Sequence, residues 1–408
     1  MSMIGSLIKP AKSDAVAADF VAFVADRESE QVLKSFVLDE ALPHTFIAQG
    51  GIEEAIARLS SMDHSPKLLL VDLQSSEMPL SDLARLASVC EPSVQVIALG
   101  ERNDVGLYRS LLGIGVGEYL VKPLTVGLLK RTLNLREGRA MPVSQARAGK
   151  VLTFVGARGG VGTTTIALNL ARNLANSRRR VVYLDLNLHG GAAPGMVGLR
   201  SNNGLLDVLQ NVNRLDPAYL ERAMQPVENS RLVMLSAQMG WDDERPFGEG
   251  ALEKVLDILV SSFHYVFLDI GERADSLTRE AFRRADRSYV VADRSVHGVH
   301  ETGRLIRYIE LCSNGSPVTS VLLNNPNMAT AGKVEPGDFV ASIGRPVLAE
   351  VPFERRALAI AENVGVPVPA GKTEAFEQII MHLSGDLTGN NQQTVVRSSL
   401  WQRLKSRK

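Results

Sequence analysis

The sequence of 408 residues has little cysteine, and its two cysteines, Cys90 and Cys312, lie far apart. Both sit in or beside apolar stretches, which predicts small buried hydrophobic side chains rather than metal ligands. Two cysteines that lie far apart are too few for a disulfide-rich scaffold. A reducing compartment fits this pattern.

Long hydrophobic runs are also missing. No run approaches the roughly 18 apolar residues that are needed to span a bilayer. The first residues, MSMIGSLIKPAKSDAVAADF, lack a charged start followed by an unbroken apolar core, so they do not predict a signal peptide. We expect a cytoplasmic protein.

Charge of one sign is not in surplus, because 45 basic side chains balance 45 acidic ones. Proteins that coat DNA usually carry a basic surplus, since neutralising phosphates drives that binding. DNA is therefore an unfavoured partner, although a neutral total can contain a local basic patch. The 45% hydrophobic content is typical of a globular protein, and the length predicts two or three domains.

Short apolar runs alternate with helical patterns along two stretches of the chain, residues 18–135 and 150–387. Such alternation predicts α/β domains, each with a parallel sheet that helices cover on both faces. We expect residues 1–17 to form a flexible N-terminus, 136–149 a linker and 388–408 a tail. The expected strands are FVAFVAD, HTFIA, KLLLVDL, VQVIALG and EYLVKP in the first stretch, and VLTFVGA, VVYLDL, LVMLSA, YVFLDI, SYVVAD, SVLLNN and PVLAEVP in the second.

The strongest local signal is the glycine-rich segment 156–165, GARGGVGTTT, between a strand and a helix. A strand, a glycine-rich turn and a helix N-terminus together present backbone N–H groups to an anion. Gly159, Gly160 and Gly162 permit positive φ and a close approach of the backbone to phosphate. Thr164 stands where a phosphate loop supplies a hydroxyl to Mg²⁺.

This segment resembles the K-G-G-x-G-K-T-T deviant Walker A motif of ParA/MinD ATPases. The resemblance puts Asp185 of VVYLDLNLHGG at the first carboxylate of a D-x-D pair and Asp269 of YVFLDIGERAD at the Walker B position. It implies a doubly wound P-loop domain, ATP and Mg²⁺ as cofactors, and Thr164, Asp185 and Asp269 as Mg²⁺ ligands. The implied nucleotide-binding residues are Arg158, Gly159, Gly160, Val161, Gly162, Thr163, Thr164, Thr165 and Asn324, the last against the adenine.

Three departures bear on activity. Thr163 replaces the lysine that neutralises phosphate charge, and Asn187 replaces the second carboxylate, so the catalytic pair Asp185 and Asn187 is degenerate. Arg158 replaces the lysine that in the family crosses to the partner's nucleotide, which implies a homodimer. We predict nucleotide binding with weak or absent hydrolysis. The alternative is a tight turn left from an ancestral ATPase.

The first domain resembles a response-regulator receiver, which implies a flavodoxin-like fold. Asp72 ends a strand where the phosphoacceptor would lie, Lys122 stands at the position of the receiver lysine, and Asp26 is one candidate Mg²⁺ acid. Gly100 falls where the switch hydroxyl would be, so a conventional readout is missing. We favour an interaction module, and Asp72 is equally consistent with an ordinary strand-end carboxylate.

Residues 395–408 have apolar and basic side chains at helical spacing. Val396, Leu400 and Leu404 would share one face beside Trp401, and basic residues flank them. This pattern favours the surface of an anionic inner membrane, with a solvated tail as the alternative.

The order of the two domains resembles the TadZ/CpaE family of pilus-assembly proteins. That resemblance implies a factor that marks a position, often a cell pole, for a tight-adherence pilus secretion machine whose proteins would be its partners. Two alternatives remain, an active partitioning ATPase of the ParA/MinD type and a phosphorylation-controlled regulator with an ATPase-like output domain.

Overall fold

The computed structural model describes residues 19–62, 65–137, 148–243, 247–271, 275–313, 318–325, 332–354, 356–366 and 373–389. The predicted flexible N-terminus, most of the predicted linker and the predicted membrane-binding segment 395–408 lie outside these residues. The chain forms two compact units, Met1–Ala148 and Gly149–Lys408. Each unit is described by itself.

The first unit has a five-stranded parallel sheet with the order β2-β1-β3-β4-β5. This is the strand order of flavodoxin-like folds, in which ligands bind at the carboxyl ends of the strands. The strands are β1 (Phe20–Val24), β2 (Thr45–Gln49), β3 (Leu68–Asp72), β4 (Gln95–Gly100) and β5 (Glu118–Val121). All five predicted strands of this unit are therefore present.

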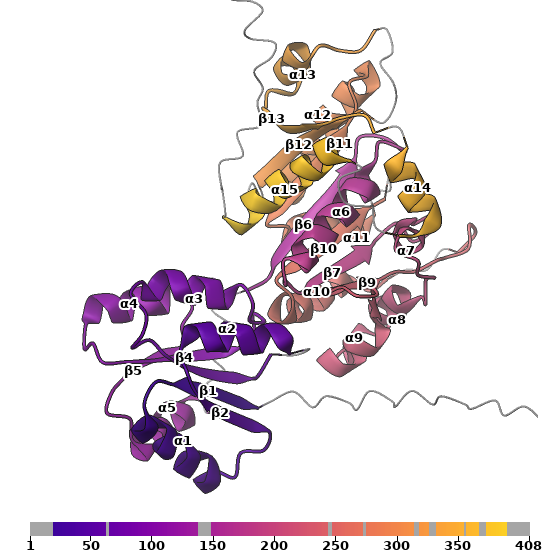
Figure 1. Ribbon diagram of the computed structural model, residues 1–408. Helices are drawn as coiled ribbons and strands as arrows, with labels where there is room; N and C mark the ends of the chain where they lie inside the picture. The colour runs from indigo at the N-terminus through magenta and orange to yellow at the C-terminus, as the bar shows by residue number, and fades with distance from the viewer. Residues whose placement is uncertain are drawn as a thin grey trace, which may run out of the picture. The chain divides into compact units, whose positions relative to one another are not determined.

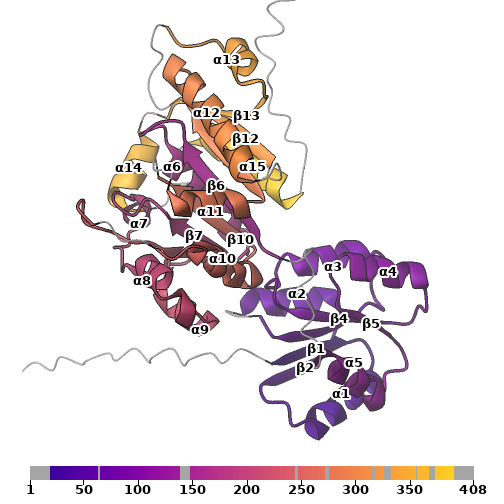
Figure 2. The ribbon, with the colours of Figure 1, turned by 180° about the vertical axis from the view of Figure 1, so that it is seen from behind.

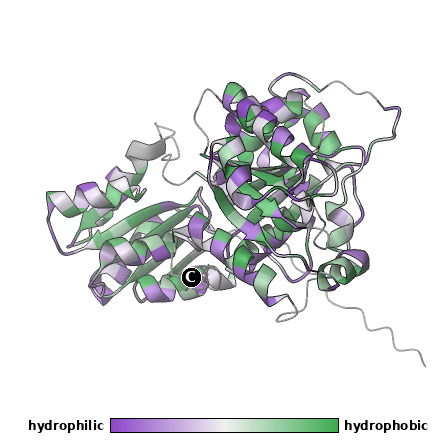
Figure 3. Cartoon of the chain, turned by 90° about the horizontal axis from the view of Figure 1, so that it is seen from above, coloured by the Kyte–Doolittle hydropathy of each residue, from purple (hydrophilic) through white to green (hydrophobic). Residues whose placement is uncertain are grey.

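Helices cover both faces of this sheet. One buried cluster joins the sheet to α2, α3 and α4, and a second joins its other face to α1 and α5. Figure 3 shows the strands mainly in hydrophobic colours and the helices in mixed colours, as two-sided burial requires. The helices are α1 (Arg27–Asp39), α2 (Ile52–Ser61), α3 (Pro79–Ala87), α4 (Val105–Gly113) and α5 (Val126–Glu137).

The second unit has an eight-stranded sheet with the order β13-β12-β11-β6-β10-β7-β9-β8. The seven predicted strands form its parallel part, and β8 adds an antiparallel edge. The sequence did not predict β8, since it has only two residues and no apolar run. The strands are β6 (Lys150–Gly156), β7 (Val181–Asp185), β8 (Gln225–Pro226), β9 (Leu232–Leu235), β10 (Tyr265–Ile270), β11 (Arg287–Ala292), β12 (Val318–Asn324) and β13 (Val347–Val351).

Helices α6 and α15 pack together on one face of this sheet (Figure 1), and α10, α11 and α12 cover the other (Figure 2). Stacked rings of Tyr183, Phe267, Phe154 and Tyr289 cross the central strands beneath α6. The helices are α6 (Thr163–Asn176), α7 (Ala193–Met196), α8 (Gly204–Gln210), α9 (Pro217–Ala223), α10 (Ala251–Ser262), α11 (Ser276–Arg284), α12 (Val296–Cys312), α13 (Pro336–Ile343), α14 (Ala357–Val364) and α15 (Glu374–Thr388), with a 3₁₀ turn at Val212–Arg214.

The predicted α/β class with parallel sheets is confirmed in both units. Continuous apolar runs such as YVFLDI became strands that are buried along their whole length, because helices cover both faces of the sheet. Within the described residues, no helix combines the length and the apolar character that a membrane span requires.

Candidate functional site

The carboxyl ends of β6, β7 and β10 surround a cleft of about 1090 Å³ in the second unit. This edge is where ligands bind in open α/β sheets. Its floor is the glycine-rich loop that joins β6 to α6. Other parts of the lining include Leu186–Gly190 after β7, Ile270 and Gly271 at the end of β10, and Glu362 of α14.

Two glycines fix the shape of the loop. Gly160 has φ of 72° and Gly162 has φ of 89°, both in the left-handed region that other residues rarely adopt. Gly162 is also the residue that precedes α6, and a Cβ there would lie 2.3 Å from Nδ2 of Asn324. The loop therefore needs glycine at this position for both conformation and space.

Asn324, at the end of β12, supports the loop from outside the cleft. Its Nδ2 donates to the Val161 carbonyl oxygen at 2.7 Å, and it is not among the described residues that line the cleft. The amide thus positions the loop in this structure. The contact with adenine that the resemblance implies stays a prediction.

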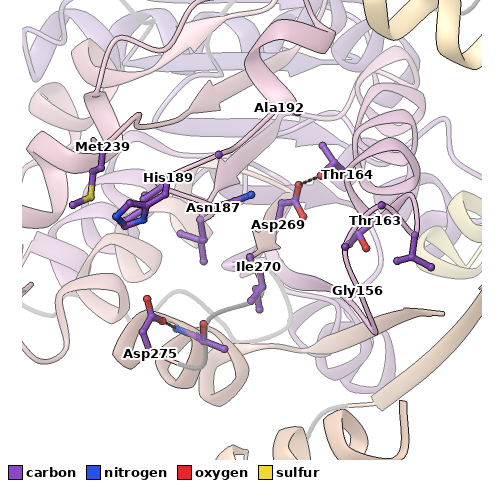
Figure 4. A pocket seen from close by; sticks show the side chains of 18 of the residues that line it. Gly156, Thr163, Thr164, Asn187, His189, Ala192, Met239, Asp269, Ile270 and Asp275 are labelled. Carbon is purple, nitrogen blue, oxygen red and sulfur yellow. Dashed lines mark hydrogen bonds between the residues drawn. The ribbon is translucent and has the colours of Figure 1, made fainter. Parts of the chain in front are cut away.

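Asp269 and Thr164 meet at the centre of the cleft, as Figure 4 shows. Oγ1 of Thr164 donates to Oδ2 of Asp269 at 2.7 Å, and the buried Tyr183 hydroxyl donates to the same oxygen at 2.8 Å. Burial raises the pKa of Asp269, and these two hydrogen bonds oppose that shift. The predicted hydroxyl and the predicted strand-end carboxylate are thus in direct contact.

Asp185 lies beside Asp269, since the two residues are paired in register on β7 and β10. Its Oδ1 accepts from the Asn187 backbone N–H at 3.1 Å. Its Oδ2 is buried with no hydrogen-bond partner among the described residues, and Gly191 covers it so closely that a Cβ there would lie 2.2 Å away. Burial, and then the charge of Asp269, raise the pKa of Asp185 to about 7.

This donor set fits Mg²⁺. One hydroxyl and two carboxylates are hard oxygen ligands of the kind that Mg²⁺ prefers. A cation or a proton would stabilise Oδ2 of Asp185, which is buried and has no hydrogen-bond partner among the described residues. The described residues contain no group of three or more His, Cys, Asp or Glu that could hold a metal ion by themselves. The remaining ligands of Mg²⁺ would be water and phosphate, as is usual for this ion.

The two substituted positions also line the cleft. Thr163 begins α6 at the position of the family's second lysine, and its hydroxyl lies against Gly156, where a Cβ would come within 2.7 Å of it. Asn187 follows β7, and its side-chain amide has no hydrogen-bond partner among the described residues. Within the described residues, neither position places a cation or a carboxylate in the cleft.

Arg158 is held within its own chain. Its Nε donates to Oδ2 of Asp293 at 2.9 Å and its Nη2 donates to the same oxygen. This contact raises the pKa of Arg158, and Ser295 holds the other oxygen of the carboxylate. Arg158 would have to leave Asp293 in order to reach a partner subunit.

Sequence reasoning missed Glu362. Its Oε1 accepts a hydrogen bond from Oγ1 of Thr165 at 2.5 Å, so a carboxylate from α14 reaches the first turn of α6 in the cleft. An acid about 200 residues from the loop has no spacing signal, and only the folded chain brings the two together.

The predicted residues of the first unit also meet. Nζ of Lys122 lies 2.6 Å from Asp26 and 2.6 Å from Asp72. The buried Asp72 accepts further bonds from the backbone N–H groups of Ala25 and Gln74, both at 2.9 Å. Every oxygen of Asp72 is therefore already bonded.

Gly100, at the position of the expected switch hydroxyl, lies against the ring of Tyr119. A Cβ on Gly100 would lie 2.5 Å from the Tyr119 hydroxyl, which donates to the Arg102 carbonyl oxygen at 2.8 Å. The tyrosine thus occupies the space that a side chain at position 100 would need. The Tyr119 ring can therefore pack in this place because residue 100 is a glycine, which has no side chain.

Comparisons with known proteins bear on the second unit. A family model described as an AAA domain matches residues 149–317. A putative septum site-determining protein MinD from Guillardia theta is 24% identical over 246 residues, which cover 58% of this chain and 88% of that protein. The chromosome partitioning protein ParA from Myxococcus xanthus is 25% identical over 179 residues, which cover 42% of this chain and 61% of that protein.

Solved structures show the same fold. A ParA family ATPase from Chlorobium tepidum covers 58% of this chain and 99% of its own, with a TM-score of 0.53 and 21% identity. The septum site-determining protein MinD from Pyrococcus horikoshii, complexed with Mg-ADP, covers 58% and 96%, with a TM-score of 0.50 and 20% identity. The second unit therefore has the fold of ParA and MinD proteins.

A putative CpaE2 pilus assembly protein from Sinorhizobium meliloti is 31% identical over 29% of this chain and 98% of that chain. Its TM-score is 0.27.

Proposed function

We propose that this protein binds ATP with Mg²⁺, hydrolyses it very slowly or not at all, and acts as a localisation or assembly factor for a tight-adherence pilus secretion system. The observation that supports the first part most strongly is the cleft itself. Its lining contains the glycine-rich loop, Thr164 and Asp269, with Asp185 buried beside Asp269 on the neighbouring strand. It has Thr163 and Asn187 where hydrolysis needs a cation and a carboxylate.

Binding rests on groups that the cleft retains. Backbone N–H groups of the loop and the start of α6 would receive the phosphates, because the positive end of a helix dipole favours an anion. Thr164, Asp269 and Asp185 would hold Mg²⁺, which neutralises phosphate charge when bound. Oδ2 of Asp185 has no hydrogen-bond partner among the described residues, so binding a cation would stabilise this carboxylate.

Slow hydrolysis follows from the groups that are missing. Phosphoryl transfer depends on cations that stabilise the charge of the transferring group and on a side chain that positions the nucleophile. The short hydroxyl of Thr163 supplies no charge, and the amide of Asn187 cannot act as a general base. The energy of binding would then serve a conformational or assembly change.

The role in pilus assembly rests on the resemblance of the two-domain order and of the motifs. The flavodoxin-like strand order of the first unit precedes the ParA/MinD-like domain, as this proposal requires. The saturated Asp72 and the tyrosine against Gly100 favour a fixed interaction module there. A fluorescent fusion should form a fixed focus in cells with the pilus genes, and a diffuse signal in those cells would contradict the role.

Two other functions keep support from particular observations. The similarity to ParA and MinD favours an active partitioning ATPase, which rapid ATP turnover would reveal. The cluster of Asp26, Asp72 and Lys122 favours a phosphorylated regulator. Phosphate on Asp72, detected by mass spectrometry after incubation with acetyl phosphate, would establish that alternative.

Attachment to an anionic membrane through residues 395–408 is a further part of the proposal. A homodimer would present two such tails and would bind more strongly through effective concentration. Flotation with anionic liposomes tests it by comparing the full chain with a chain that ends at Gln393. Equal flotation of the two proteins would rule out the tail as the anchor.

A further inference from the structure

A second cavity of about 530 Å³ lies in the ParA/MinD-like domain, and its lining shares no residue with the cleft described above. Five segments of the fold line it: α6, the residue after α7, the turn between β8 and β9, the residues after α14, and the first turns of α15. The volume is within the range of small-molecule sites, about 300–1,000 Å³.

Arg172 is the basic residue among the described residues that line this cavity. Arg172 of α6 is half-buried, and it forms no hydrogen bond or ion pair with any of the described residues. Burial lowers its pKa, with no neighbouring acid opposing the shift. A guanidinium removed from water without a partner costs free energy, which an anion would recover.

The start of α15 adds to this positive character. Thr373 precedes the helix, makes no side-chain cap, and lines the cavity together with Phe376 and Glu377. The N-terminus of a helix of fifteen residues carries partial positive charge. The lining also contains two acids, the exposed Glu228 and Glu377, and Oε1 of Glu377 accepts from the Thr373 hydroxyl.

The rest of the lining divides into amides and an apolar wall. The side chains of Asn173, Asn176 and Asn229 have no hydrogen-bond partner among the described residues. Phe376 and Ile380 of α15 and Val197 after α7 form the apolar side. A ligand that satisfies both sides has a charged head, hydrogen-bonding groups and an apolar body.

We propose that this cavity binds a small organic anion, whose carboxylate or phosphate group pairs with Arg172 while its apolar part packs against Phe376 and Ile380. The site is separate from the nucleotide cleft and does not depend on ATP binding. It lies on α6, the same helix whose first turn belongs to the phosphate loop.

The test is calorimetric titration of the full chain with two probes, phenyl phosphate and benzoate. We expect one of them to bind with a stoichiometry of one, and the better probe identifies the charged group. Arg172→Gln should weaken this binding about ten- to a hundredfold, as the loss of a charge-assisted hydrogen bond would. Ile380→Trp, which fills the cavity from its apolar wall, should also weaken it.

Two controls separate this site from others. Arg200→Gln removes an exposed arginine and should leave binding unchanged. Gly162→Val distorts the phosphate loop and should also leave it unchanged, so a probe lost in this variant was bound in the nucleotide cleft. The proposal is overturned if neither probe binds, if Arg172→Gln binds as the wild type does, or if Gly162→Val removes the binding.

Discussion

Asp185 shows how a single residue is held in an unfavourable state. Folding buries its carboxyl group beside Asp269 and raises its pKa from 3.8 to about 7. Between these two values the folded protein binds more protons than the unfolded chain, so the free energy of unfolding falls as pH rises. This cost, on the order of a few kcal/mol at pH 8, is what a bound cation would relieve.

Asp185→Asn should remove the cost. The amide keeps an acceptor for the Asn187 N–H and removes the buried charge beside Asp269. We expect urea denaturation in the presence of a chelator to show that the variant is more stable than the wild type at pH 8. Its stability should also change less between pH 5 and pH 8. The exposed Asp242→Asn is the matched control, and equal pH dependence in all three proteins would contradict this account.

At this scale the sequence predicted the residues of the cleft better than their contacts. Thr164, Asp185 and Asp269 were placed by the resemblance of the loop and of the strand-end acids to the ParA/MinD motifs. The structure brings Thr164 into contact with Asp269 and pairs Asp269 with Asp185 in register. The contact between Glu362 and Thr165 and the pairing of Arg158 with Asp293 were not found, since each depends on which loops converge in space. Asn324 was assigned to the adenine by resemblance, which stays a prediction, and its amide supports the loop in this structure.

At the scale of elements, α10 depends on a distant acid. The buried Glu280 of α11 accepts from the backbone N–H groups of Gly250, Leu252 and Glu253 at 3.0, 2.9 and 3.3 Å. These N–H groups lie at the start of α10, where the capping position is Gly250, which has no side chain that could accept from them. The carboxylate replaces the missing cap and complements the helix dipole.

Glu280→Ala should loosen the first turn of α10. Buried donors left without an acceptor cost about 1–3 kcal/mol, so hydrogen exchange of the Leu252 and Glu253 amides should become faster by that amount in free energy. Exchange measured by mass spectrometry or NMR checks this, with the exposed Glu249→Ala as the control. Unchanged protection in Glu280→Ala would show that packing alone holds the turn.

The strands were the feature of this chain that the sequence predicted best. The twelve predicted strands are all present, because continuous apolar runs between helical patterns are typical of buried parallel strands. The edge strand β8 was missed, since two residues that include Pro226 carry no such signal. The capping of α10 by Glu280 was equally invisible, as it joins two helices through space.

At the scale of the whole molecule, the pair of Arg158 and Asp293 would control self-association. If Arg158 reaches the nucleotide of a second subunit, Asp293 competes with that contact. We expect Asp293→Asn to strengthen ATP-dependent dimerisation by up to about fivefold, the worth of a partly exposed ion pair. Arg158→Ala should weaken it.

Sedimentation velocity with and without ATP and Mg²⁺ measures both variants. Arg178→Ala, which removes an exposed arginine elsewhere, is the control. An ATP-dependent dimer that Arg158→Ala leaves unchanged would mean that other surfaces hold the subunits together.

The central claim is that the cleft binds ATP with Mg²⁺ without efficient hydrolysis. The most direct test is calorimetric titration with ATP and Mg²⁺, followed by phosphate release measured on the same preparation. We predict saturable binding that Thr164→Ala weakens and Asn187→Ala leaves nearly intact, with turnover orders of magnitude below the roughly 1–100 s⁻¹ typical of kinases. Absence of binding, or turnover within that range, would contradict the account.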